Sequence, residues 1–230
     1  MPLNKVKGNM YGFITHTFNM VKGICPHGCS YCYMSKRGKL KPVRFDITEH
    51  RTELGKGNHI FVGSSCDMWA EEIPTEWILW TLMHCQKYSG NRYFFQSKNP
   101  SRFVDMLMFV DMSRVSSKVT FCTTIETNRI YPEIMGKTLS PGARAAFMAG
   151  VATAFPTHVT IEPIMDFDLQ ELLMLIHRIN PTQVNIGADS KGCNLPEPSP
   201  EKVKTLIEEL KQMVPTVYLK PNLKRLLLQA

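Results

Sequence analysis

The chain has 230 residues, of which 43% are hydrophobic and 20% are charged, a composition that excludes disordered and fibrous proteins. Its 27 basic residues outnumber its 20 acidic residues, and the formal net charge of +7 favours a polyanionic partner. No stretch approaches the roughly 18–20 consecutive apolar residues of a membrane helix, and seven cysteines, an odd number, argue against a disulfide framework. We therefore expect a cytoplasmic protein without membrane contact, folded as a single domain over residues 1–230.

Short apolar, β-branched runs alternate with amphipathic stretches along the chain. The runs predict strands at 14–18, 60–63, 93–96, 119–125, 158–162, 183–187 and 216–219, and the amphipathic stretches predict helices at 76–88, 169–179 and 201–213. Apolar strands that alternate with helices predict an α/β protein with a parallel sheet, either doubly wound or barrel-like. Six or seven strands in this length favour a partial barrel over a full eightfold one.

Between the first two predicted strands, Cys25, Cys29 and Cys32 follow one another at C-x3-C-x2-C spacing. Three thiolates leave one coordination position open, which is typical of a catalytic rather than a structural metal site. The spacing favours a 4Fe–4S cluster, because zinc motifs usually combine two paired units and no second pair is present. A zinc site that takes His27 or Cys66 as its fourth ligand is the alternative. We expect the metal-binding loop at 23–34 and a helix after it.

Polar and small residues follow the later strands, at the end where barrel enzymes place their chemistry. In chain order they are Ser64, Ser65, Cys66, Asp67, Ser97, Lys98, Thr124, Glu126, Glu162, Asp189 and Ser190. Basic residues form two further groups that could contact phosphates or simply be solvated, namely Lys36, Arg37, Lys39, Lys41 and Arg44, and Lys220, Lys224 and Arg225.

The cysteine loop and the strand ends together resemble the radical S-adenosylmethionine (SAM) superfamily. The resemblance implies a partial (β/α)6-type TIM barrel, closed by the C-terminal segment 214–230. It also implies that the three cysteines hold a 4Fe–4S cluster whose open iron is chelated by SAM. An electron from a donor such as flavodoxin or ferredoxin would then cleave SAM to methionine and a 5′-deoxyadenosyl radical, which abstracts a substrate hydrogen.

Two narrower resemblances involve the same positions. In the spore photoproduct lyase group, which repairs a thymine dimer, a tyrosine also lies on either side of the third cysteine, as Tyr31 and Tyr33 do here. A phage- and prophage-encoded radical SAM-like family of unassigned function is similar over roughly 10–222, in the segments Ser-Lys98-Asn-Pro, Thr-Ile-Glu126-Thr-Asn and Ile-Glu162-Pro-Ile. The second resemblance implies a location in the cytoplasm of a phage host.

The superfamily resemblance implies SAM contacts from the strand ends: Tyr33 at the adenine, Ser64, Ser65 and Asp67 at the methionyl ammonium, Lys98 at the carboxylate, and Thr124, Glu126 and Asn128 at the ribose or methionyl group. Three of these residues have a structural alternative. Tyr33 could pack behind the cluster, Asp67 could cap a following helix, and Lys98 could be a surface lysine in a turn. A carboxylate at position 126 is expected to have a partner, because an unpaired buried charge is costly.

Three residues are candidates for action on the substrate: Cys66, Glu162 and Asp166. The resemblance to spore photoproduct lyase implies that the Cys66 thiol returns a hydrogen atom to a substrate radical, whereas free cysteine is commonly a small buried hydrophobe. Glu162 and Asp166 leave the fifth strand on the open side of the barrel, where they could contact substrate or form ion pairs. His27 is expected to orient the cysteine loop.

The expected substrate is a hypermodified, thymine-type base of phage DNA, or a nucleotide, which the enzyme would modify or rearrange. A base in duplex DNA would have to be extruded to reach the barrel interior. The alternatives are base repair with Cys66 as hydrogen donor, radical chemistry on a small metabolite or peptide, and a non-catalytic, metal-stabilised nucleic-acid-binding module.

Overall fold

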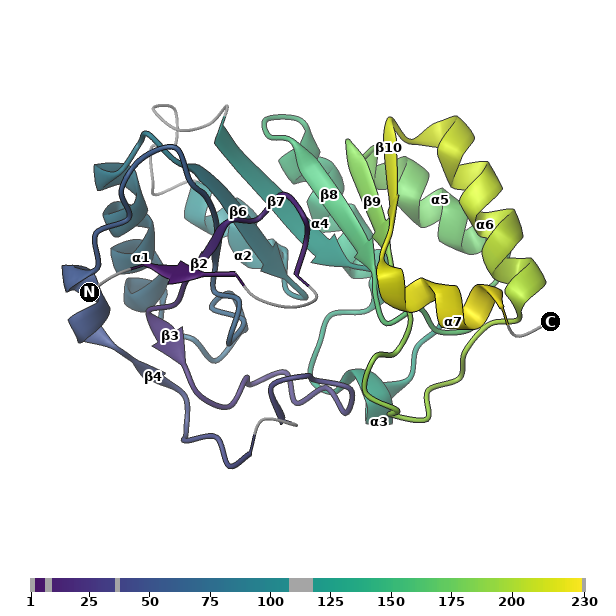
Figure 1. Ribbon diagram of the computed structural model, residues 1–230, viewed down its shortest axis with the longest axis horizontal. Helices are drawn as coiled ribbons and strands as arrows, with labels where there is room; N and C mark the ends of the chain where they lie inside the picture. The colour runs from purple at the N-terminus through teal and green to yellow at the C-terminus, as the bar shows by residue number, and fades with distance from the viewer. Residues whose placement is uncertain (1–2, 7–9, 36–37, 108–117, 229–230) are drawn as a thin grey trace.

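The computed structural model describes residues 3–6, 10–35, 38–107 and 118–228. Its main element is an eight-stranded sheet in the order β1-β2-β5-β6-β7-β8-β9-β10 (Figure 1). The strands are β1 (Asn4–Lys5), β2 (His16–Phe18), β5 (His59–Val62), β6 (Arg92–Ser97), β7 (Val119–Thr124), β8 (Thr157–Ile161), β9 (Gln183–Ile186) and β10 (Thr216–Leu219). All neighbours from β2 to β10 are parallel, and only β1 is antiparallel to its partner.

The longer helices connect successive strands of the sheet and cover one of its faces (Figure 1). They are α1 (Thr75–Lys87), α2 (Ser101–Leu107), α4 (Pro141–Ala152), α5 (Leu169–Ile179) and α6 (Pro200–Met213). The shorter helical elements are α3 (Pro132–Met135), α7 (Lys224–Leu227), η2 (Ile47–Arg51) and η4 (Pro221–Leu223). Local sequence sets two of the starts. Ser140 and Ser199 cap α4 and α6, and a proline occupies the first helical position of each.

The main hydrophobic core lies between the sheet and these helices. Strand residues such as Phe95, Val159 and Val184 are fully buried there against helix residues such as Met148 and Leu206. A second cluster of buried side chains, around Tyr11, covers the opposite face of the sheet. Burial on both faces explains why the strands read as continuous apolar runs, as the strands of parallel sheets do. None of the helices in the described ranges is long and apolar enough to cross a membrane.

All seven predicted strands are confirmed, with ends that differ by at most two residues, and the three predicted helices correspond to α1, α5 and α6. The sequence did not predict α4, because its alanines and glycines give little amphipathic contrast. The helix expected after Cys32 is wrong for the described residues. The chain instead returns as β4 (Arg44–Phe45), antiparallel to β3 (Val21–Lys22), and the Pro42 ring is incompatible with a helix interior.

The expectation that the C-terminal segment closes the barrel is also corrected. In the described part of the chain, β10 is paired with β9 at one edge of the sheet and β1 forms the other edge, so the sheet stays open. Tyr11 lies against the inner face of the sheet. Its hydroxyl bonds to Gln96 on β6 and Thr160 on β8, and its ring centroid is 5.0 Å from Lys220 Nζ, directly after β10. The N-terminal segment thereby fills the inner side of the partial barrel.

Candidate active site

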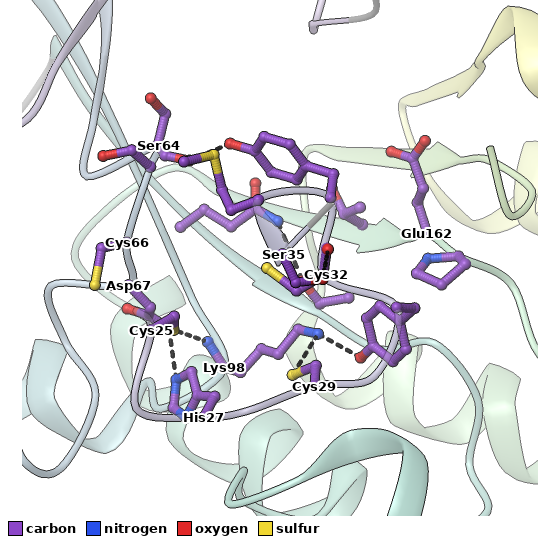
Figure 2. Close-up of a pocket in the computed structure, with 18 of the residues that line it drawn as sticks. Cys25, His27, Cys29, Cys32, Ser35, Ser64, Cys66, Asp67, Lys98 and Glu162 are labelled. Atoms are coloured by element: carbon purple, nitrogen blue, oxygen red, sulfur yellow. Dashed lines mark hydrogen bonds and ion pairs between the residues drawn. The ribbon is translucent and has the colours of Figure 1, made fainter. Parts of the chain in front are cut away.

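A pocket of about 670 Å³ lies at the carboxyl ends of the parallel strands. The cysteine loop forms one wall, and the strand ends form the others (Figure 2). The predicted site residues that line it are Cys25, Cys29, Cys32, Tyr33, Ser64, Ser65, Cys66, Asp67, Lys98, Thr124 and Glu162, with Asp189 and Ser190. Residues spread over most of the chain therefore meet in one place, as the fold class predicts for strand ends.

The cysteine loop is held by the segment that contains α3. Ser30 N donates to Ile134 O over 2.9 Å, Lys137 N donates to His27 O over 2.7 Å, and the Cys29 thiol donates to Met135 O over 3.2 Å. Gly136 lies at this contact with a φ of +64°, and a Cβ atom there would come within 2.1 Å of His27 O. The loop can dock only because residue 136 has no side chain.

Asp67 joins the cysteine loop to the strands. Its carboxylate is 2.8 Å from His27 Nε2 and accepts hydrogen bonds from Ser97 Oγ at 2.8 Å and from Lys98 N at 3.0 Å. Although burial works against the imidazolium, the Asp67 carboxylate raises the pKa of His27. Asp67 also accepts from Trp69 N at 3.0 Å, so it caps the turn after β5 rather than a helix. His27 orients the loop through Asp67, as expected.

Cys25 and Cys66 influence each other's ionisation. The neighbouring Cys66 thiol lowers the pKa of Cys25 to about 6, and Cys25, together with burial, raises the pKa of Cys66. Cys66 is almost completely buried but lines the pocket, so its two predicted environments, core and pocket wall, are both present.

The hydroxyls at the end of β5 have different partners. Ser64 Oγ and Ser65 N both donate to Asn19 Oδ1, over 3.3 Å and 2.9 Å, and the Tyr33 hydroxyl donates to Ser64 O. Ser65 Oγ is a buried atom without a hydrogen-bond partner among the described residues. An unmatched hydroxyl on the wall of a pocket fits a polar ligand, because it can donate and accept.

Glu126 lies behind the pocket wall and has the charged partners that the sequence requires. Arg144 Nη1 is 2.6 Å from its Oε2, Lys98 Nζ is 2.9 Å from its Oε1, and the Tyr31 hydroxyl donates to Oε1. Although burial alone would raise it, Arg144 and Lys98 hold the pKa of Glu126 well below its usual range. Arg144 was not predicted, and its only sequence signal is a lone arginine in an alanine-rich helix.

Glu162 lines the pocket but is tied to the C-terminal segment. Lys220 Nζ is 2.7 Å from Glu162 Oε2, and Asn222 Nδ2 donates to Oε1 over 3.0 Å. The sequence placed Lys220 in a basic run, whereas the structure buries it in the pocket wall. Lys220 follows β10 directly, so its position at the end of a strand could have predicted that it lies at the pocket.

Asp166 and Asn128 are not brought to the pocket, which corrects their predicted placement. Asp166 forms ion pairs with Arg129 and Lys202, and Asn128 Nδ2 donates to Glu171 Oε2 over 2.6 Å. The backbone on either side is fixed by strand-end hydrogen bonds, such as Met165 N to Glu126 O at 3.0 Å, and this directs Asp166 to the outer loops. Lys39, Lys41 and Arg44 are exposed, and Lys36 and Arg37 lie outside the described residues.

The cysteine set fits an iron–sulfur cluster. Among the described residues, no three His, Cys, Asp or Glu side chains converge as ligands of a single ion, and no disulfide involves the described cysteines. The three thiols instead line different parts of one pocket (Figure 2). That arrangement suits a cluster, because each thiolate binds a different iron. The cationic groups of Lys98 and His27 lie beside them and would stabilise thiolates.

The sequence matches no protein-family model and no curated protein. The structure is similar to a double mutant of spore photoproduct lyase with bound AdoMet and dinucleoside spore photoproduct, with a TM-score of 0.65 and 16% identity over 92% of this chain and 78% of that chain. A cysteine-to-alanine mutant of that lyase with dinucleoside spore photoproduct gives a TM-score of 0.66 and 14% identity over 95% of this chain and 80% of that chain. The chain thus has the α/β fold with a mostly parallel sheet that forms the partial TIM barrel of spore photoproduct lyase.

Proposed function

We propose that the protein is a radical SAM enzyme in which Cys25, Cys29 and Cys32 bind a 4Fe–4S cluster. The observation that carries the proposal is the pocket that these three thiols share with polar strand ends, in a fold that is also found in a lyase with bound AdoMet. When bound, the cluster supplies the electron, received from a donor such as flavodoxin or ferredoxin, that cleaves SAM to methionine and a 5′-deoxyadenosyl radical. The chain's own residues position SAM and substrate.

The proposed SAM contacts are the strand-end residues that line the pocket. The buried, unmatched Ser65 hydroxyl is available to the methionyl ammonium, and the Thr124 side chain reaches the pocket floor beside Gln96. Tyr33, which lines the pocket, is proposed to contact the adenine through its aromatic ring. Asp67 acts through the loop, because the hydrogen bonds described above occupy its carboxylate.

The proposed substrate is a thymine-type base, in DNA or in a nucleotide, that the enzyme modifies or repairs. The exposed Lys39 and Lys41 flank Leu40, which lines the pocket, and the exposed Lys191 lines it on the side of β9. Positive charge at two sides of a pocket mouth suits the phosphates that flank an extruded base. The similar lyase has been captured with a dinucleoside. A free metabolite or peptide gives no comparable role to these lysines.

Release of 5′-deoxyadenosine from SAM tests the function. After anaerobic reconstitution and reduction with dithionite, the parent protein is expected to form 5′-deoxyadenosine and methionine in equal amounts. A variant with Cys25, Cys29 and Cys32 all replaced by alanine is expected to form none. Binding of DNA without SAM cleavage by the parent would instead support the non-catalytic module.

The Cys66 thiol is proposed to donate its hydrogen atom to the product radical. We expect Cys66→Ala to keep SAM cleavage but to lose at least about tenfold in product that has gained hydrogen from the enzyme, because alanine has no weak X–H bond. Mass spectrometry of products formed in D₂O measures this, since the thiol exchanges with solvent. Cys122→Ala is the matched control, because Cys122 is a fully buried cysteine outside the pocket lining. Equal deuterium incorporation in Cys66→Ala and the parent would contradict the assignment.

A further inference from the structure

Lys98 has a contact that the resemblance did not predict. Its ammonium lies 3.5 Å from Cys29 Sγ (Figure 2). It also lies 2.9 Å from Glu126 Oε1 and within hydrogen-bond distance of the Tyr31 hydroxyl. A lysine ammonium has three N–H donors, and these three partners match them. A SAM carboxylate could be bound only if one of these hydrogen bonds were lost.

Two groups hold Lys98 from behind. Glu126 is completely buried and binds Lys98 with one carboxylate oxygen and Arg144 with the other, at 2.9 Å and 2.6 Å. Arg144 is completely buried too, and it also donates to Thr124 O and Leu139 O, both over 2.7 Å. These contacts hold the Arg144 guanidinium in place. The guanidinium positions the Glu126 carboxylate, and the carboxylate positions the Lys98 ammonium next to Cys29.

The charges in this network do not cancel. Lys98 and Arg144 contribute two positive charges and Glu126 contributes one negative charge, while the Tyr31 hydroxyl donates a hydrogen bond to Glu126 and adds no charge. One excess positive charge therefore lies in a poorly solvated place, and the lysine that bears it contacts Cys29. Charge and hydrogen bonds at a ligating sulfur set the reduction potential of an iron–sulfur cluster.

We propose that Lys98, positioned by Glu126 and Arg144, sets the reduction potential of the cluster held by Cys29, rather than binding the SAM carboxylate. This inference rests on the proposed function. A positive charge beside the cysteine favours the more negatively charged, reduced cluster, so Lys98 makes reduction easier. Glu126 has two opposing effects: it positions the lysine, and its negative charge offsets part of the lysine's field.

Variants with opposite charge changes test the inference. Lys98→Met removes the positive charge and is expected to shift the midpoint potential of the reconstituted cluster to more negative values. Lys98→Arg keeps the charge and is expected to restore most of the shift. Glu126→Gln removes the negative charge and is expected to shift the potential to more positive values. An EPR-monitored redox titration measures all three. If Glu126→Gln does not fold, the two Lys98 variants decide the question.

Lys137→Met is the matched control, because it removes one lysine charge from the segment that docks on the cysteine loop, at a side chain that is 79% exposed. Its potential should equal that of the parent. An unchanged potential in Lys98→Met, with SAM affinity reduced tenfold or more in equilibrium dialysis, would overturn the inference and assign Lys98 to the SAM carboxylate. If the parent protein bound no cluster, both this inference and the proposed function would be overturned. If Lys98→Met bound a cluster with an unchanged potential, only this inference would be overturned.

Discussion

Replacement of Arg144 by methionine is expected to lower the free energy of unfolding by about 3–5 kcal/mol, the cost of breaking a buried ion pair by removal of one partner. Arg144 and Glu126 are both completely buried, and their ion pair measures 2.6 Å. Arg144 also satisfies the carbonyls of Thr124 and Leu139. Methionine fills similar volume but donates no hydrogen bond, so these acceptors and part of the Glu126 charge would lose their partner. Urea unfolding of the cluster-free protein measures the loss.

Arg178→Met is the matched control, because Arg178 lies on α5 with an exposed side chain. Its free energy of unfolding should stay within about 0.5 kcal/mol of the parent value. A loss below about 1 kcal/mol in Arg144→Met would mean that the Arg144–Glu126 pair does not stabilise the fold, and the network behind Lys98 would then lack its anchor.

Replacement of Gly136 by alanine is expected to prevent the cysteine loop from docking. The backbone conformation at residue 136, with φ +64° and ψ −146°, costs a residue other than glycine about 1–3 kcal/mol. The added Cβ would in addition lie 2.1 Å from His27 O, and backbone atoms cannot yield as a flexible side chain can. We expect a loss of stability of at least this size, together with a severalfold lower iron content after reconstitution.

Gly142→Ala is the matched control for that variant. Gly142 lies in α4, and a Cβ atom there meets no heavy atom within 4 Å. Alanine should therefore be neutral, or stabilising by up to about 1 kcal/mol, because glycine is a poor helix former. Iron content and stability of Gly136→Ala equal to those of Gly142→Ala would show that the α3 segment does not hold the loop.

The sequence predicted the strand framework because a parallel sheet buried on both faces requires continuous apolar runs. It also predicted the position of the cysteine loop and of most pocket residues, since both depend on where a strand ends. Cys25, Ser65, Lys98 and Glu162 all lie at the pocket for this reason. Strand ends are local features of a sequence.

Partners across the fold could not be predicted in the same way. Arg144 lies 18 residues from its acidic partner Glu126, and Lys220, directly after β10, lies 58 residues from Glu162. Each pair forms only because α4 and β10 pack in place on or beside the sheet. The predicted placement of Asp166 was wrong for the same reason, because its side chain forms ion pairs with Arg129 on a loop and with Lys202 in the first turn of α6. Ion pairs depend on the tertiary packing of helices and strands, which the spacing of residues in the sequence does not predict.

The most direct test of the central claim is EPR spectroscopy of the reduced, anaerobically reconstituted protein before and after addition of SAM, together with metal analysis. The account predicts about four irons per chain, as for one 4Fe–4S cluster, and a reduced-cluster signal whose g-values change on addition of SAM. Both should be lost when Cys25, Cys29 and Cys32 are replaced by alanine. One zinc per chain with no uptake of iron, or a cluster signal that SAM leaves unchanged, would contradict the account.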